Sequence, residues 1–70
     1  MTIQRVSLDP DRMGGLPIIR YTRVTVGMVL GQLATGRTVD DLLGDYPYLE
    51  REDLLAALRY GAAIVNRRLA

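Results

Sequence analysis

The sequence predicts a mainly α fold: a three-helix, helix-turn-helix-like (homeodomain-like) bundle with a short N-terminal arm of two strands. Three observations predict it. A stretch that alternates between apolar and polar residues and a run rich in β-branched and aromatic residues lie within the first 24 positions, and apolar residues then recur at helical spacing. Threonine, glycine and proline stand where helices would begin or end. Because the chain has 70 residues, we expect residues 1–70 to form a single domain.

Residues 1–24 are predicted to form the β arm and its loop. Ile3–Leu8 alternates between apolar and polar side chains, which is typical of a short half-buried strand, and an Asp-Pro-Asp turn follows it. Ile18–Val24 is rich in β-branched and aromatic residues, which favours a second strand. Two such strands are not stable alone. They need a helical layer or a second subunit to cover them. In an isolated chain we expect either Ile18 or Ile19 to be exposed to solvent.

The first helix is expected over residues 25–36. Thr25 can accept hydrogen bonds from the free amides of the first turn, and Gly36 suits a left-handed C-terminal cap. Gly27 and Gly31 lower the helix propensity, so we expect them to permit close packing against another helix.

The second helix, over residues 38–45, begins at Thr38, with Asp41 in the position of a capping box. The last helix is expected over residues 50–69 and has acidic residues in its first turn, which suit the helix dipole. Its apolar face is broader than two short helices can cover, so we expect part of it to meet a second subunit or another protein. The residues of this face are Leu54, Leu55, Ala57, Leu58, Gly61, Ala62, Ile64, Val65 and Leu69.

The small size of the chain predicts a homodimer. A domain of this length buries only about 60% of the surface that its unfolded chain exposes. Neither disulfides nor structural zinc can stabilise it, because cysteine and histidine are absent. The residues expected at the dimer or partner interface are Ile18, Ile19, Tyr21, Leu55 and Ile64. The lack of cysteine, of a signal peptide and of a long apolar run leads us to expect a cytoplasmic protein with no membrane partner.

Charge is divided unevenly along the chain. Residues 1–37 carry a net charge of +3, and residues 38–70 carry −2. This division suits an anionic partner at the N-terminal end, although an ordinary solvated surface is an equally good interpretation. If a partner or nucleic acid is bound there, the residues expected to contact it are Arg5, Arg12, Arg20 and Arg23.

An enzyme is not expected, and no catalytic residue, cofactor or metal site is assigned. A serine or cysteine triad cannot be built without histidine, and the glycines match neither a P-loop nor a dinucleotide fingerprint. Close carboxylate pairs occur at 9/11, 40/41 and 52/53, but turns and helix N-termini account for them.

The usual recognition helix of a helix-turn-helix protein presents its N-terminal residues to the major groove of DNA. Here those residues are Glu50, Arg51, Glu52 and Asp53, whose acids would repel phosphates. The basic arm, which carries Arg5, Arg12, Arg20 and Arg23, is therefore the better candidate for a DNA contact. The affinity of such phosphate contacts would depend steeply on salt concentration.

Two stretches resemble a known family. Gly14–Val26 reads GGLPIIRYTRVTV, and Leu33–Tyr60 reads LATGRTVDDLLGDYPYLEREDLLAALRY. The pattern is similar to that of domain-of-unknown-function family 433, small prokaryotic proteins regarded as VapB-type antitoxins. Three residues depart from it: Tyr21 replaces a glycine, Thr25 a proline and Glu50 a threonine helix cap. Because tyrosine resists positive φ, we expect an extended backbone at Tyr21.

The resemblance implies a helix-turn-helix-like fold, dimerisation, and pairing with a nuclease-like toxin whose operon the complex represses by binding DNA. Ala70 follows directly on the last expected helix, so we expect a toxin to be held by the folded surface. Arg20 and Arg23 would then face an acidic partner site or phosphate. The alternative is a structural or adaptor dimer with no nucleic-acid role.

Overall fold

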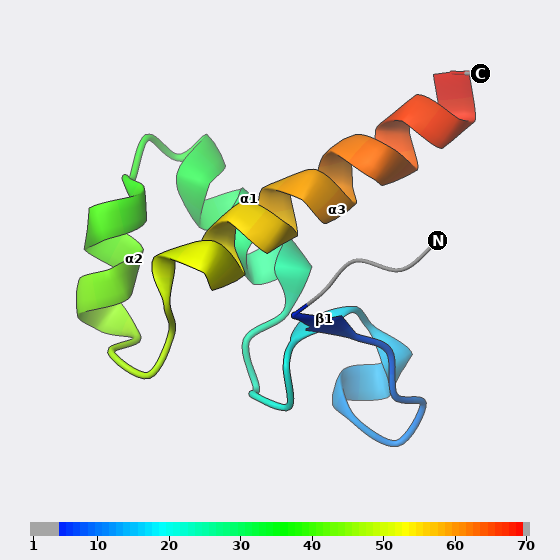
Figure 1. Ribbon diagram of the computed structural model, residues 1–70, viewed down its shortest axis with the longest axis horizontal. Coiled ribbons are helices and arrows are strands. Elements are labelled where there is room, and N and C mark those ends of the chain that lie inside the picture. The colour runs from blue at the N-terminus through cyan, green and yellow to red at the C-terminus, as the bar shows by residue number, and fades with distance from the viewer. Residues whose placement is uncertain (1–4, 70) are drawn as a thin grey trace.

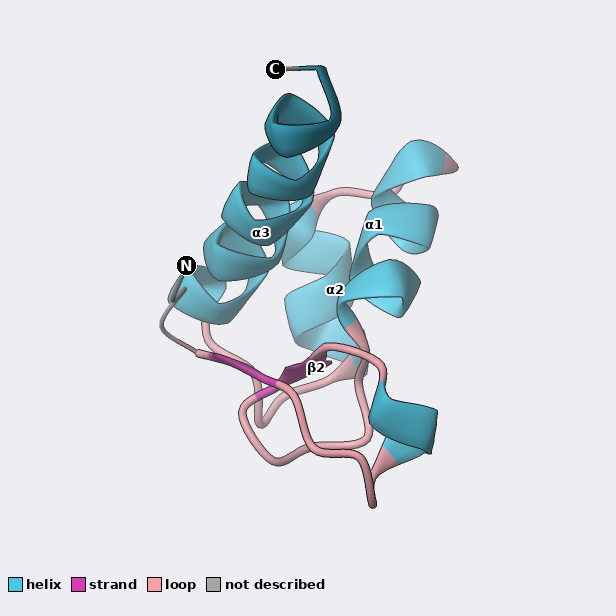
Figure 2. Cartoon of the chain, turned by 90° about the vertical axis from the view of Figure 1, so that its right-hand side faces the viewer, coloured by secondary structure: helices cyan, strands magenta, loops and turns pink. Residues whose placement is uncertain are grey.

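The structure is a computed structural model that describes residues 5–69. It shows three helices packed on a small β arm (Figures 1 and 2). The predicted mainly α, three-helix fold is confirmed. In chain order the elements are β1 (Val6–Ser7), the short helical turn η1 (Met13–Gly15), β2 (Ile18–Ile19), α1 (Val26–Ala34), α2 (Val39–Asp45) and α3 (Arg51–Leu69).

The two strands are shorter than the sequence suggested. β1 and β2 pair antiparallel, with Val6 opposite Ile19 and Ser7 opposite Ile18. The first four residues of the chain, which include the expected start of the first strand, lie outside the described residues. The second strand was expected to reach Val24, and this prediction is wrong because the chain turns after Ile19.

The turn after β2 is closed by hydrogen bonds around one threonine. The Ile19 N–H donates to the Val24 carbonyl at 2.9 Å, and the Thr22 hydroxyl donates to the Ile19 carbonyl at 2.7 Å. The same hydroxyl accepts from the Val24 N–H at 3.1 Å. Tyr21 has no positive φ, as expected for a tyrosine, but it lies within this turn and not in an extended strand. The positive φ falls one residue earlier, at Arg20 (48°).

The caps read from the sequence are confirmed. The Thr25 hydroxyl accepts from the Met28 N–H at 3.0 Å and starts α1. Thr38 and Asp41 form a reciprocal capping box at the start of α2, each side chain accepting from the backbone N–H of the other. Gly36 has a φ of 95°, the left-handed conformation expected just beyond α1.

The core lies between the three helices and the arm. Ile18 and Ile19 are both fully buried, so the expectation that one of them would be wet is wrong. Ile19 joins the main cluster of apolar side chains, to which all three helices contribute, so it is buried without a second subunit. The arm lies beneath the helices (Figure 2). The cluster is made of Ile19, Val24, Val26, Val29, Leu42, Leu49, Leu54 and Ala57.

Close helix packing occurs at a different glycine from the two that were expected. A Cβ at Gly31 would meet nothing within 4 Å, and one at Gly27 would meet only the Thr25 hydroxyl, at 3.9 Å. Gly61 on α3 instead lies against Leu30 of α1, where a Cβ would come within 3.0 Å of Leu30 Cδ1. The contact of α1 with α3 therefore depends on Gly61.

The two halves of α3 have different surroundings. Its N-terminal half carries the core residues Leu54 and Ala57, whereas its C-terminal end extends past the other helices (Figure 1). Within residues 5–69, no helix is both long enough and apolar enough to cross a membrane.

Candidate functional site

Two of the four arginines proposed for partner binding are held in ion pairs within the chain, although both side chains stay partly exposed. Arg5 Nη1 donates to Glu50 Oε1 at 2.6 Å and to Asp53 Oδ1 at 2.9 Å. Arg20 Nη2 donates to Asp53 Oδ2 at 3.0 Å and to the Tyr48 carbonyl at 2.9 Å. Both guanidinium groups thus face acids and carbonyls of the same chain, and their charge is largely compensated.

Asp53 is the centre of this cluster, and its side chain is fully buried. Besides the two arginines, it accepts a hydrogen bond from the Glu50 N–H, with Oδ2 2.8 Å from the nitrogen, which caps the first turn of α3. Burial raises the pKa of this carboxyl group. The hydrogen bond from Glu50 and the charges of Arg5 and Arg20 lower it by more, so the net pKa of Asp53 lies below its ordinary value.

Arg12 and Arg23 form no ion pair within residues 5–69; Arg12 is half-buried and Arg23 is exposed. Arg12 Nη2 donates to the Tyr21 carbonyl at 2.9 Å, and its guanidinium lies over the Tyr21 ring, 5.6 Å from the centroid. The two arginines line a polar cavity of about 440 Å³ together with Asp11 and Met13.

The start of α3 presents side chains that are acidic or already paired. Arg51 is paired with Asp40 of α2, and Glu50 is paired with Arg5. Glu52 adds a free negative charge on the exposed side. The surface at the start of α3 is therefore acidic, as the sequence indicated.

The five residues proposed for the dimer or partner interface fall into different places. Ile18 and Ile19 are fully buried within the chain, so the folded protein cannot present them to a partner. Tyr21 is 67% exposed and lies under Arg12. Leu55 and Ile64 are half-buried on α3. The structure therefore leaves Tyr21, Leu55 and Ile64 accessible, and it does not bring the five together into one surface.

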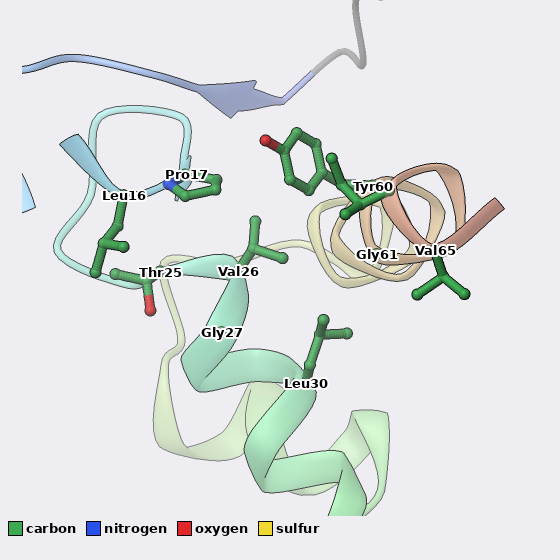
Figure 3. Close-up of a pocket in the computed structure, with 10 residues that line it drawn as sticks. Leu16, Pro17, Thr25, Val26, Gly27, Leu30, Tyr60, Gly61 and Val65 are labelled. Atoms are coloured by element: carbon green, nitrogen blue, oxygen red, sulfur yellow. The ribbon is translucent and has the colours of Figure 1, made fainter. Parts of the chain in front are cut away.

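A feature that the sequence did not indicate is an apolar groove of about 350 Å³ between α1 and the C-terminal half of α3. Figure 3 shows its walls: Leu16 and Pro17 of the loop before β2, Val26 and Leu30 of α1, and Tyr60 and Val65 of α3. Thr25, Gly27, Gly61 and Ile64 complete the lining.

Leu16 marks one rim of the groove and is 56% exposed, and Val65 marks the opposite rim and is 55% exposed. Such exposed apolar side chains around a hollow are typical of a binding surface. A leucine between a glycine and a proline in a loop was the available signal, but the groove itself depends on how α1 and α3 are placed.

In each carboxylate pair noted in the sequence, at least one member has a structural role. The Asp9 side chain accepts from the Asp11 N–H at 2.9 Å in the turn after β1, while Asp41 and Asp53 cap helices. In the part of the chain that the structure describes, no three acidic side chains gather as a metal site would require.

Comparisons with known proteins identify the family. The model of a family described as "Protein of unknown function (DUF433)" matches residues 6–61. The chain is also 38% identical over 58 residues to "Uncharacterized protein y4eO" of Sinorhizobium fredii (strain NBRC 101917 / NGR234). That match covers 83% of the chain but only 26% of the relative, so the chain spans about a quarter of that protein's length. No solved structure gives a significant match. Since the family match takes in most of the described fold, from β1 to the middle of α3, the chain belongs to the DUF433 family.

Proposed function

We propose that this protein is an antitoxin-like regulator of a type II toxin-antitoxin pair, which neutralises a nuclease-like toxin on its folded surface. The resemblance noted in the sequence supplies the kind of partner. The observation that carries the proposal is the open apolar groove between α1 and α3. A groove of this kind receives apolar side chains of a partner helix or strand, and their desolvation supplies most of the binding energy.

The polar cavity adds a second contact beside the groove. Met13 lines the polar cavity and Leu16 lines the groove, so the loop from Met13 to Pro17 borders both. Arg23 lines the polar cavity and forms no ion pair within residues 5–69. An acidic, metal-binding nuclease site is the kind of surface that an arginine guanidinium can occupy. We therefore assign the role of a plug to Arg23 and withdraw Arg20, which is paired with Asp53.

Co-expression with the product of the adjacent gene tests the proposal. We expect a stable complex, and rescue of growth when that product is toxic. Leu16→Glu places a charge at the rim of the groove and is expected to abolish the rescue. Leu8→Glu is the matched control, since Leu8 is 63% exposed and lines neither cavity. Absence of both complex and rescue with the unmodified chain would refute the proposal.

A second candidate function is a structural or adaptor dimer with no nucleic-acid role. The observation that favours it is the pairing of Arg5 and Arg20 with acids of the same chain, which compensates two of the four positive charges of the arm. The acidic start of α3 points the same way. In a protein that binds operator DNA, Arg12 and Arg23 are the arginines of the arm that we expect to contact phosphates.

Binding to the upstream DNA at low and at high salt separates these two candidates. A regulator that contacts phosphates binds at low salt and loses affinity as salt rises. An adaptor binds at neither salt concentration.

A further inference from the structure

A row of apolar side chains remains uncovered on the outward side of α3. Leu55, Leu58, Ala62 and Val65 follow one another at intervals of three, four and three residues. Leu58 is 40% exposed and Val65 is 55% exposed, Ala62 is also exposed, and Leu55 is half-buried. Alternating steps of three and four residues are the spacing of the apolar seam between two helices of a coiled coil. We call these four residues the α3 seam.

One flank of the α3 seam carries an acid and an arginine that can pair with the same two residues of a second copy. Glu52 and Arg59 stand seven positions apart on the same flank, both are exposed, and neither forms an ion pair within residues 5–69. In an antiparallel helix pair this flank lies against the same flank of the second copy. Glu52 of each copy can therefore face Arg59 of the other, which gives two equivalent contacts. In a parallel pair this flank would instead face Leu54 and Gly61, which carry no charge.

We propose that a second copy of this chain packs antiparallel along the α3 seam, with Glu52 of each copy facing Arg59 of the other. In this register Leu55 lies against the second copy's Leu58. Tyr48, which is exposed just before the start of α3, lies near the second copy's Val65. The pairing covers three large side chains that the single chain exposes, which are Tyr48, Leu58 and Val65.

The inference does not rest on the proposed function. The groove that would hold a toxin lies on the side of α3 that faces α1, and only Val65 belongs to both surfaces. A failure of toxin binding therefore leaves the dimer untouched, and a failure of the dimer leaves the groove untouched. The dimer expected from the size of the chain is in this way assigned to α3 and not to Ile18 and Ile19.

Sedimentation equilibrium of the full chain tests the pairing. We expect a mass twice the 7.8 kDa of one chain at high micromolar concentration. Leu58→Glu should leave a monomer whose circular dichroism matches that of the unmodified chain. Met28→Glu is the matched control, because Met28 is similarly exposed but lies on α1, off the seam, and it should remain dimeric.

A charge swap tests the register. Glu52→Arg and Arg59→Glu each create two repulsive pairs in a dimer, and each is expected to raise its Kd by about tenfold. The double variant Glu52→Arg/Arg59→Glu restores both pairs and should restore the Kd. The two positions lie on one helix face two turns apart, so a purely intrachain role would not produce this recovery.

Cysteine substitution tests the direction of the pair, since the chain has no cysteine of its own. Mixed Glu52→Cys and Arg59→Cys chains should form the mixed disulfide on oxidation. Disulfides between two Arg59→Cys chains in preference to the mixed product would overturn the antiparallel arrangement. A monomer at every concentration, or a dimer indifferent to Leu58→Glu and to the charge swap, would overturn the proposal as a whole.

Discussion

Arg20 Nη2 lies 3.0 Å from Asp53 Oδ2, and this contact joins residues 33 positions apart in the chain. It ties the turn that follows β2 to the first turn of α3. Arg5 reaches the other oxygen of the same carboxylate from the residue before β1. The arm, which has only two short strands, is thus fixed to the helices by a charge cluster as well as by Ile19.

Asp53→Asn is expected to lower the free energy of unfolding by about 2–3 kcal/mol. The change leaves two arginines without their shared acid, and breaking a buried pair costs about 3–5 kcal/mol when both partners are buried. The loss is smaller here because Arg5 and Arg20 are partly solvated. Urea denaturation measures this loss: the midpoint concentration of urea should fall, while the dependence of the unfolding free energy on urea concentration stays unchanged.

Glu52→Gln is the matched control for this change, because it removes a neighbouring carboxylate that is exposed and unpaired within residues 5–69. It should change the free energy of unfolding by less than about 0.5 kcal/mol when measured on the monomer. Equal effects of the two substitutions would show that Asp53 does not hold the arm.

The stability of the protein is expected to fall in acid. The folded chain holds the pKa of Asp53 below its ordinary value, so the unfolded chain takes up the proton first as pH falls. The stabilisation is fully present above the unfolded pKa of about 4 and is lost as pH falls through the lower folded value. Asp41 adds to the same trend, because the hydrogen bond that its carboxylate accepts from the Thr38 N–H also lowers its pKa.

Urea denaturation at a series of pH values between about 2 and 7 checks this dependence. The difference in stability between the unmodified chain and Asp53→Asn should be constant near neutral pH and should shrink in acid. A difference that stayed the same throughout this range would contradict the assignment.

Gly31→Ala and Gly61→Ala are expected to differ although both glycines lie inside helices. At Gly31 a Cβ meets nothing within 4 Å, so the substitution should stabilise the protein by about 0.5–1 kcal/mol through helix propensity. At Gly61 the new Cβ would press on Leu30 Cδ1 at 3.0 Å, and the gain should be reduced or abolished. Thermal unfolding of the two variants side by side measures the difference, and an equal gain would mean that the contact of α1 with α3 is loose.

Binding to operator DNA, where it is detected at low salt, should depend on Arg12 and Arg23. The double variant Arg12→Gln/Arg23→Gln is expected to reduce the slope of log affinity against log salt by about 2 for each chain. Arg20→Gln should instead lower the stability of the fold and leave the slope of the folded protein unchanged, since its guanidinium is paired with Asp53. A loss of slope with Arg20→Gln in the folded protein would show that this arginine faces DNA after all.

The helices could be predicted from the sequence because their signals are local. Thr25, Thr38 and Gly36 act on backbone groups within a few residues, and the structure shows each in the expected role. The strand over Ile18–Val24 could not be excluded in this way. Its residues favour extended structure, but the Thr22 hydroxyl closes a turn and the contact of Arg20 with Asp53 spans the whole fold.

The candidate site was predictable only in part. The sequence indicated which residues were basic, but whether an arginine faces solvent or an acid depends on distant elements, and Arg5 and Arg20 meet theirs at the start of α3. It also indicated that the apolar face of the last helix was too broad to be covered. Which part is covered, and where a groove opens beside Leu30, is decided by the placement of α1.

The central claim is that the groove between α1 and α3 holds a partner protein. Titration calorimetry of the purified chain with the purified product of the adjacent gene tests it most directly. The account predicts saturable binding that Leu16→Glu weakens at least about tenfold and that Leu8→Glu leaves unchanged. Equal binding by both variants, or no heat of binding with the unmodified chain, would contradict the claim.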